Sequence, residues 1–181
     1  MPHLVAPVTP DRWADFSDLF TRRGPRGGSP ITAGCQCMWW RQRTGNATAN
    51  EAAMRGIVGS GRVPGLLAYD GNGLAVGWVS VAAREDYGQL MRSRHYGPRD
   101  TDTGVWAIVC FYVDPRHKRQ GVATELLDAA IAHARQRGAA AVEAYVSDAG
   151  DYMGRLADFT ARGFVATRVA GKRTVVRLSV S

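Results

Sequence analysis

The sequence has no apolar run long enough to cross a bilayer, so we expect no membrane-spanning segment. Its first residues, MPHLVAPVTPDRW, lack the basic stretch and apolar core of a secretory signal. Cysteine is scarce: Cys35, Cys37 and Cys110 are an odd number, at no spacing typical of a disulfide framework. These absences predict a cytoplasmic protein that has no membrane partner.

Acidic residues are also few. The chain carries 16 acidic and 23 basic side chains, a net charge of +7, which favours a polyanionic partner such as a nucleic acid, a membrane surface or a phosphorylated small molecule. The basic residues are scattered, aromatic residues are not interleaved with them, and no recognised nucleic-acid-binding motif is present. We therefore expect no nucleic-acid partner, and solvation of the surface accounts for most of the basic clusters.

The 181 residues, 45% apolar and 22% charged, predict one globular domain that spans 1–181. Helical spacing indicates helices after Thr9, over ANEAAMRGIV, from about Thr124 to Gly138, and over DYMGRLADFTARG. Runs of β-branched and aromatic residues predict strands at GLLAYD, LAVGWVSVAA, VWAIVCFYV and AAVEAYV, and two more strands close the chain. The segment RRGPRGGSP, between the first two helices, is predicted to be a loop.

The run VWAIVCFYV is apolar throughout, which is typical of a central strand covered on both faces. A strand, a helix and a second strand occupy residues 105–146, and a right-handed crossover makes these two strands parallel. The hairpins elsewhere make the remaining strands antiparallel. We therefore predict an α/β (α+β) fold with a mixed, mostly antiparallel central sheet, one parallel strand pair and about four flanking helices.

The segment VDPRHKRQGVATELL joins the central strand to the following helix. The backbone N–H groups of residues 119–123 lie where that helix begins, so they can point together at one anion. Lys118 and Arg119 add positive charge, and Gly121 lets a ligand approach the backbone closely. A plain strand-to-helix loop with solvated basic residues explains the same spacing, and neither the Walker motif nor the dinucleotide motif GxGxxG is present.

The same segment resembles the acyl-CoA-binding motif of the GNAT superfamily of N-acetyltransferases, Gln/Arg-x-x-Gly-x-Gly/Ala. Here residues 118–123 fill the motif, and Lys118 stands in place of the usual Gln or Arg. FTARGF, which begins at Phe159, is similar to the Tyr-x-x-x-Gly-Phe that ends the last helix of the family. The resemblance covers residues 66–164, and the CxCMWW element near the N-terminus is similar to that of an uncharacterised bacterial branch.

The resemblance implies a GNAT fold and acetyl-CoA as co-substrate. In that family the pyrophosphate lies on the amides of this loop, the pantetheine arm lies along the preceding strand, and the next strand splays away to leave a slot for the thioester. The N–H of Phe111 would then donate to the thioester carbonyl. The residues implied to bind the cofactor are Phe111, Val113, Lys118, Arg119, Gln120, Gly121, Val122, Ala123, Thr124 and Phe159.

The resemblance also implies that an amine attacks the thioester directly in a ternary complex. The frequent thiolate acid of the family is the tyrosine that Phe159 replaces here, so the acid is open, and Tyr152 or Tyr145 can substitute. Glu143 alternates with Tyr145 on one strand, so both can face the slot. An ion pair with an arginine is the other interpretation of Glu143. There are two other candidate bases. One is Glu85, at the end of the fold where amines often enter, and the other is a chain of water molecules.

Trp39 and Trp40 belong to the N-terminal region that flanks the amine site in the family. They either line an acceptor pocket or pack as an aromatic cluster beneath a long loop. Cys110 is interpreted as a packing residue, because no histidine lies near it in the sequence. Cys35 and Cys37 are too close together for a tetrahedral metal site, and the four histidines are dispersed. We therefore expect no metal.

Together these features predict a GNAT-type N-acyltransferase that moves an acetyl group from acetyl-CoA to a primary amine of a small molecule. A non-catalytic acyl-CoA-binding or regulatory protein and a protein-amine acetyltransferase remain alternatives. Phe159 and the unassigned base motivate the first of them. Dimers are frequent in the resembled family, so a homodimer is a further expectation.

Overall fold

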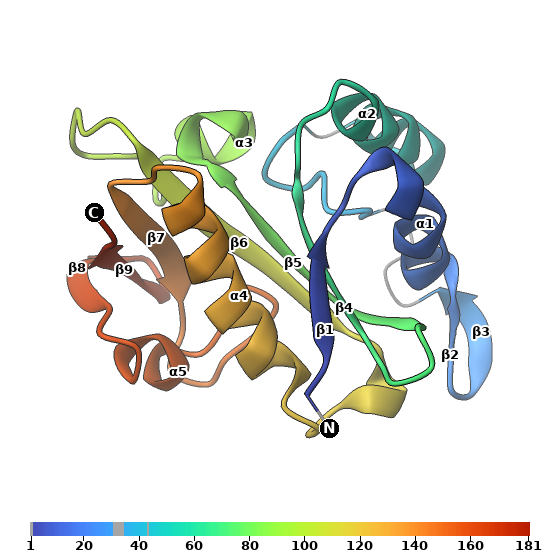
Figure 1. The fold of residues 1–181 in the computed structure, drawn as a ribbon. Coiled ribbons are helices and arrows are strands. Elements are labelled where there is room, and N and C mark those ends of the chain that lie inside the picture. Colours follow the sequence, from blue (N-terminus) through green and yellow to red (C-terminus); the bar gives the residue numbers. More distant parts are fainter. Residues whose placement is uncertain (1, 31–34, 43) are drawn as a thin grey trace.

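A seven-stranded mixed sheet forms the centre of the molecule (Figure 1). The computed structural model describes residues 2–30, 35–42 and 44–181. The strand order is β1-β4-β5-β6-β7-β9-β8; β6 and β7 run parallel, and the other neighbouring pairs are antiparallel. The strands of this sheet are β1 (Leu4–Pro7), β4 (Gly65–Tyr69), β5 (Ala75–Ala83), β6 (Val105–Val113), β7 (Ala141–Val146), β8 (Val165–Ala170) and β9 (Arg173–Ser179).

This topology confirms the predicted mixed, mostly antiparallel fold, and β6 is the central strand as predicted. The described residues contain five α-helices and three one-turn 3-10 helices, compared with the four or so predicted. Asn46 caps α2 by accepting a hydrogen bond from the Ala49 N–H (2.8 Å). No helix in the described part of the chain has both the length and the apolar composition to span a membrane. The helices are η1 (Pro10–Arg12), α1 (Trp13–Thr21), α2 (Ala47–Gly59), η2 (Arg84–Asp86), α3 (Gly88–Met91), η3 (Pro115–His117), α4 (Val122–Gln136) and α5 (Leu156–Thr160).

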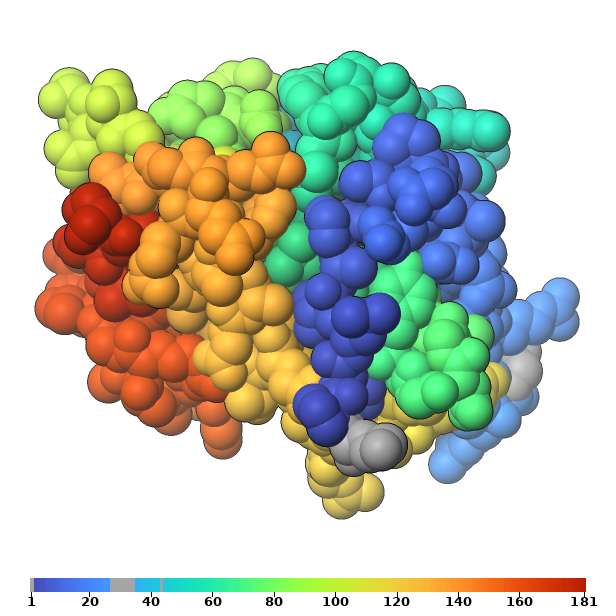
Figure 2. All heavy atoms as spheres, viewed as in Figure 1, coloured from blue at the N-terminus to red at the C-terminus, as the bar shows by residue number. Residues whose placement is uncertain are grey.

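Helices cover both faces of the sheet, and each face has its own apolar cluster. The α4 helix packs against β4, β5 and β6 through a buried stripe that includes Leu127 and Ile131, as its spacing predicts. On the opposite face, α1, α2 and the segment around Met38 contribute to one apolar cluster that contains Trp78. Figure 2 shows the α4 side of the molecule, where the N-terminal residues lie beside α4.

Three local features differ from the sequence predictions. The segment RRGPRGGSP contains a short hairpin of β2 (Arg23–Gly24) and β3 (Gly27–Pro30) instead of a loop. The last helix, α5, is only five residues long. Gly150 and Gly154, upstream of it, take φ angles of +76° and +107°, which a right-handed helix excludes. The edge strand β1 was not predicted, because four residues carry too short a pattern.

Candidate active site

Asp114 fixes the turn with which the predicted cofactor loop leaves β6. Its buried carboxylate accepts a hydrogen bond from the Arg116 N–H (2.9 Å) and pairs with Arg22 Nη1 (3.0 Å). Burial raises the pKa of Asp114, but the Arg116 N–H and the Arg22 guanidinium outweigh burial and lower the pKa overall. The role of Asp114 is not evident from the sequence, because its partner Arg22 lies 92 positions away in the chain.

The backbone at the start of α4 has the shape of an anion cradle. Arg119 and Gly121 take positive φ angles of +62° and +84°, on either side of Gln120. Alternation of this kind gathers successive N–H groups into a concave nest. Gly121 caps α4 without a side chain, and in the described part of the chain no protein oxygen accepts from the N–H groups of residues 121–124. These amides, together with the helix dipole, suit an oxyanion such as a phosphate.

A cleft of about 510 Å³ opens beside this loop, and His117, Lys118 and Arg119 contribute basic side chains to its lining. A second cleft of about 350 Å³ continues between α4 and α5 and shares Phe111 and Thr124 with the first. The loop that the sequence singled out therefore borders a continuous surface depression. Of the predicted cofactor-binding residues, Phe111, Val113, Lys118, Arg119, Gly121, Val122, Ala123 and Thr124 line the first cleft, Phe159 lines the second, and Gln120 lines neither.

A β-bulge in β6 decides which side chains face the other layer. In the pairing of β5 with β6, Ser80 lies opposite Cys110. The next residue, Val81, lies opposite Ile108, so Val109 is an extra residue on β6. Val109 and Cys110 consequently both join the apolar cluster on the α1–α2 face, although neighbours in a regular strand point to opposite faces.

The strands β6 and β7 pair along only the first part of β6. Their parallel ladder ends at Ile108 and Ala144, so they separate as the resemblance implies. Residues of the loop 147–155 occupy the open edge of β6, where the Phe111 N–H donates to the Tyr152 carbonyl at an N···O distance of 2.5 Å. The protein's own backbone therefore uses this N–H here, and it would serve a thioester carbonyl, as predicted, only after the Tyr152 carbonyl releases it.

Tyr152 lies at the junction of the first cleft and a third, apolar pocket, and it lines both. The Arg173 guanidinium lies over its ring, 5.5 Å from the centroid, and also pairs with Asp151 (2.9 and 2.5 Å). Burial raises the pKa of Tyr152, so the hydroxyl is protonated at neutral pH. The sequence placed Tyr152 on the last helix, whereas the structure places it in the loop before that helix.

The apolar pocket has a volume of about 300 Å³ and lies where the CQCMWW segment meets β6. Trp39 is 49% exposed and Trp40 only 8%, so Trp39 forms the outer wall. No group of three or more potential ligand side chains among the described residues is arranged to hold a metal ion. The residues that line the pocket are Cys35, Cys37, Trp39, Trp40, Val109, Cys110 and Tyr152.

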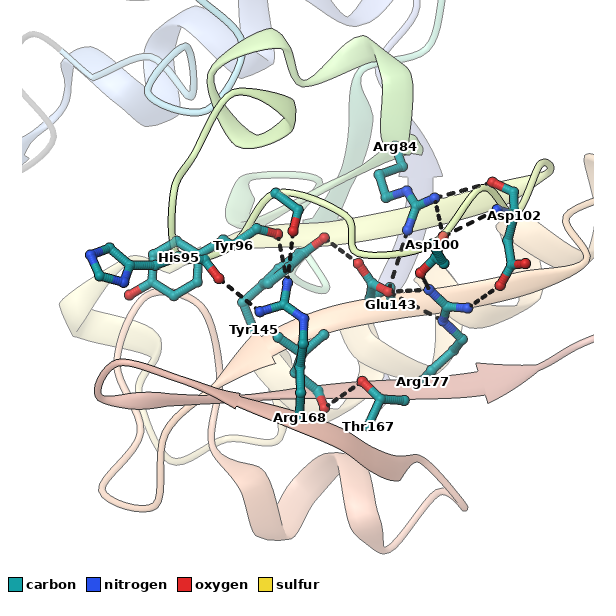
Figure 3. A network of polar contacts seen from close by, with 12 residues as sticks. Arg84, His95, Tyr96, Asp100, Asp102, Glu143, Tyr145, Thr167, Arg168 and Arg177 are labelled. Carbon is teal, nitrogen blue, oxygen red and sulfur yellow. Dashed lines mark hydrogen bonds and ion pairs between the residues drawn. The ribbon is translucent and has the colours of Figure 1, made fainter.

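Glu143 and Tyr145 belong to a network of charged groups (Figure 3). The Tyr145 hydroxyl donates to Glu143 Oε1 (2.5 Å), and Arg177 Nη2 lies 2.5 Å from Glu143 Oε2. Arg84 Nη1 approaches the same oxygen at 3.5 Å, and Asp100 pairs with both arginines (2.9 and 2.7 Å). Glu143 is 3% exposed. This geometry corresponds to the ion-paired interpretation of Glu143.

The structure does not bring the three predicted acid–base residues together at the clefts. Glu143 and Tyr145 line none of the three clefts described above. Glu85 is exposed on η2, beyond the end of β5 that pairs with Trp106, and it lines none of them either. The position of Tyr152 between two clefts, by contrast, could not be found from the sequence pattern.

Comparisons with known proteins bear on this arrangement. The model of the acetyltransferase (GNAT) family matches residues 33–158. The fold is similar to YhbS of Escherichia coli in complex with CoA (16% identity, TM-score 0.56, covering 100% of this chain and 83% of that chain). It is also similar to yncA of Salmonella typhimurium with acetyl-CoA (16% identity, TM-score 0.58, covering 100% of this chain and 95% of that chain). A third similar structure is a phosphinothricin acetyltransferase of Sinorhizobium meliloti with acetyl-CoA (14% identity, TM-score 0.57, covering 99% of this chain and 89% of that chain). No curated protein sequence matches the chain.

Proposed function

Since the chain belongs to the GNAT acetyltransferase family, we propose that it moves an acetyl group from acetyl-CoA to the primary amine of a small molecule in the cytoplasm. The observation that carries this proposal is the set of amides at residues 121–124, which have no partner among the described residues and border a cleft lined with basic side chains. Structures with this fold that hold CoA or acetyl-CoA support the choice of co-substrate.

Acetyl-CoA supplies the acetyl group as an activated thioester. The amides of residues 121–124 bind the diphosphate, and Lys118 and Arg119 neutralise part of its charge. The open edge of β6 at Phe111 and Val113 holds the pantetheine arm, once the Tyr152 carbonyl has released the Phe111 N–H. The protein thereby directs the thioester to the gap between β6 and β7, and the apolar pocket on the other face receives the amine.

We assign proton donation to the leaving thiolate to Tyr152. Phe159, which stands at the family's tyrosine position, has no acidic proton and packs edge-on against Phe111 and Phe164. Tyr152 is protonated and lines both the first cleft and the apolar pocket. A non-catalytic acyl-CoA-binding protein is the second candidate, favoured by the hydrogen bond in which the Phe111 N–H is already used.

The diphosphate site can be tested at Ala123, which is exposed and lines both cofactor clefts. Ala123→Glu adds a carboxylate beside the diphosphate, so we expect the Kd for acetyl-CoA, measured by calorimetry, to rise at least about tenfold. An acidic residue in the first turn of a helix interacts favourably with the helix dipole, so the variant should lose no stability. Gly121 is less suitable, because a side chain at φ +84° would itself strain the loop.

Two matched variants control this test. Ala123→Gln adds similar bulk without charge, and Ala132→Glu adds the same charge at an exposed position further along α4. Both should keep the Kd within about threefold of the wild type, since neither sets a charge beside the phosphates. Equal affinity in wild type and Ala123→Glu would show that the diphosphate binds elsewhere.

Catalysis is tested separately by mixing the protein with acetyl-CoA and a panel of amines. The expected result is release of the thiol together with an acetylated amine, detected by a thiol reagent and by mass spectrometry. Binding of acetyl-CoA without thiol release from any amine would favour the non-catalytic candidate.

A further inference from the structure

The apolar pocket beside Tyr152 restricts the chemistry of the acceptor. We infer that the acceptor is a weakly basic amine on a flat, uncharged body, that is an aromatic amine, and not an alkylammonium ion such as a polyamine. The inference rests on the proposed acetyl transfer and narrows its substrate class.

The pocket lies where an acceptor must lie. Val109 and Cys110, which the bulge turns to the α1–α2 face, form one wall of it, and Phe111, the next residue of β6, lines the cofactor cleft. Tyr152 lines both the pocket and the cleft, so it lies between the two. A volume of about 300 Å³ is at the small end of small-molecule sites, and the indole of Trp39 forms part of the pocket wall.

The lining contains no side chain that would form an ion pair with a cation, and its aromatic rings would attract one only modestly. Its members are aromatic residues, cysteines and one valine, with no carboxylate and no imidazole. Residues 1, 31–34 and 43, which lie outside the described ranges, contain no acidic residue and no histidine.

The charged residue that follows the pocket-lining Trp40 in the chain is an arginine, Arg41. Arg41 is 6% exposed and lies over the Tyr87 ring (4.3 Å to the centroid). Its Nη2 donates to the Pro64 carbonyl (3.0 Å), and in the described structure it has no carboxylate within ion-pair distance. The charge of Arg41 acts on Cys37 in the pocket lining, so it also repels an ammonium ion that enters the pocket. Entry into the apolar pocket would in addition cost that ion its hydration.

No group in the pocket is suited to remove a proton from an ammonium ion. Burial raises the pKa of Cys35 to about 11, so it is a neutral thiol at pH 7. Burial raises the pKa of Cys37, but hydrogen bonds from Cys110 and Trp78 lower it overall. Cys37 is nevertheless only 4% exposed and its Sγ accepts from Trp78 Nε1 (2.9 Å), so it is shielded from the proton of an acceptor. Cys110 and Tyr152 are protonated, because burial and neighbouring groups raise both pKa values. The amine must therefore arrive neutral.

An alkylamine as basic as lysine is neutral in only about one molecule in 2,500 at pH 7, whereas an aromatic amine is almost wholly neutral there. In the reaction the amine nitrogen forms a bond to the acetyl carbon as the carbon–sulfur bond breaks. The Tyr152 hydroxyl gives its proton to the sulfur and receives the proton that the nitrogen loses. No further acid, base or oxidant is needed.

The test compares 4-methoxyaniline with 4-methoxybenzylamine, which have nearly the same body but differ in basicity, and with spermidine. At pH 7 we expect kcat/KM for the aniline to exceed that for the benzylamine at least about tenfold. Between pH 7 and 8 kcat/KM should rise about tenfold for the benzylamine and stay level for the aniline, because only the former gains neutral amine. Preference for spermidine or the benzylamine at pH 7 overturns the inference and leaves acetyl transfer intact. Absence of product from every amine overturns both.

Variants of the wall give an independent readout. Trp39→Ala should lower kcat/KM for 4-methoxyaniline at least about tenfold with an unchanged Kd for acetyl-CoA, and Trp39→Phe should restore most of it. Leu74→Ala, which removes another exposed apolar side chain that does not line the pocket (43% exposed), should change neither value. Cys35→Asp should raise kcat/KM for the benzylamine, whereas Cys35→Ser should not. Unchanged kinetics in Trp39→Ala would show that the acceptor does not use this pocket.

Discussion

The variant Glu143→Gln separates the two interpretations of the buried carboxylate. Glutamine keeps the size of the side chain and an oxygen that can accept from the Tyr145 hydroxyl. It removes the negative charge that lies 2.5 Å from Arg177 and 3.5 Å from Arg84. If Glu143 is an ion-pair partner, the substitution changes stability; if it is the general base, the substitution changes kcat.

The expected loss of stability follows from the contacts. A charged hydrogen bond such as the one to Arg177 contributes about 1.5–3 kcal/mol. Arg84 and Arg177 both keep Asp100 as a partner, so the loss should stop short of the roughly 3–5 kcal/mol of a wholly unpaired buried charge. We expect the free energy of unfolding to fall by about 2–3 kcal/mol and Tm by about 4–12 °C for a chain of this size.

The assay combines urea unfolding with steady-state kinetics at a temperature at which both proteins are folded. We expect kcat to stay within about threefold of the wild type, because Glu143 lines none of the three clefts. Glu85→Gln is the matched control: its carboxylate is exposed on η2, so stability should change by less than about 0.5 kcal/mol. A fall of kcat by a factor of about a hundred with unchanged stability would refute the ion-pair interpretation and identify Glu143 as the base.

Two further predictions concern Tyr152 and acid unfolding. Tyr152→Phe should lower kcat about 10- to 100-fold at an unchanged Kd for acetyl-CoA, and the loss should shrink with an acyl donor whose thiol is more acidic; an unchanged kcat would mean that the thiolate leaves unaided. The hydrogen bond from Arg84 lowers the pKa of Asp100 to about 2, below its unfolded value, so this carboxylate stabilises the fold above pH ~4 and loses that effect as the pH falls towards 2. Asp100 is exposed, and solvent screens its ion pairs, so urea unfolding should show wild type only about 1 kcal/mol more stable than Asp100→Asn at pH 6 and nearly equal to it at pH 2. A difference that does not vary with pH would contradict this assignment.

The local parts of the fold were predictable from the sequence. The apolar run that becomes β6, the hairpin of β4 and β5, and the stripe on α4 all follow from patterns within about twenty residues. Gly121 at the N-cap of α4 could be found in the same way, since the short cofactor loop lies within one strand–loop–helix unit.

The environment of each candidate side chain depended on residues far away in the chain. Glu143 and Tyr145 alternate on β7 as predicted, but Arg177 from β9 and Arg84 from η2 turn the carboxylate into an ion-pair partner. Tyr152 was assigned to a helix, because the pattern of the segment did not reveal the two glycines with positive φ.

The sequence by itself therefore determined most of the strands, the helix that Gly121 caps and the resemblance of its loop to a cofactor motif, because each depends on neighbours in the chain. Only the tertiary structure decided that the bulge at Val109 faces the CxCMWW segment and that Tyr152 stands between the cofactor cleft and an apolar pocket. Pairing between distant strands fixes those positions, and one sequence carries no direct signal of such pairing.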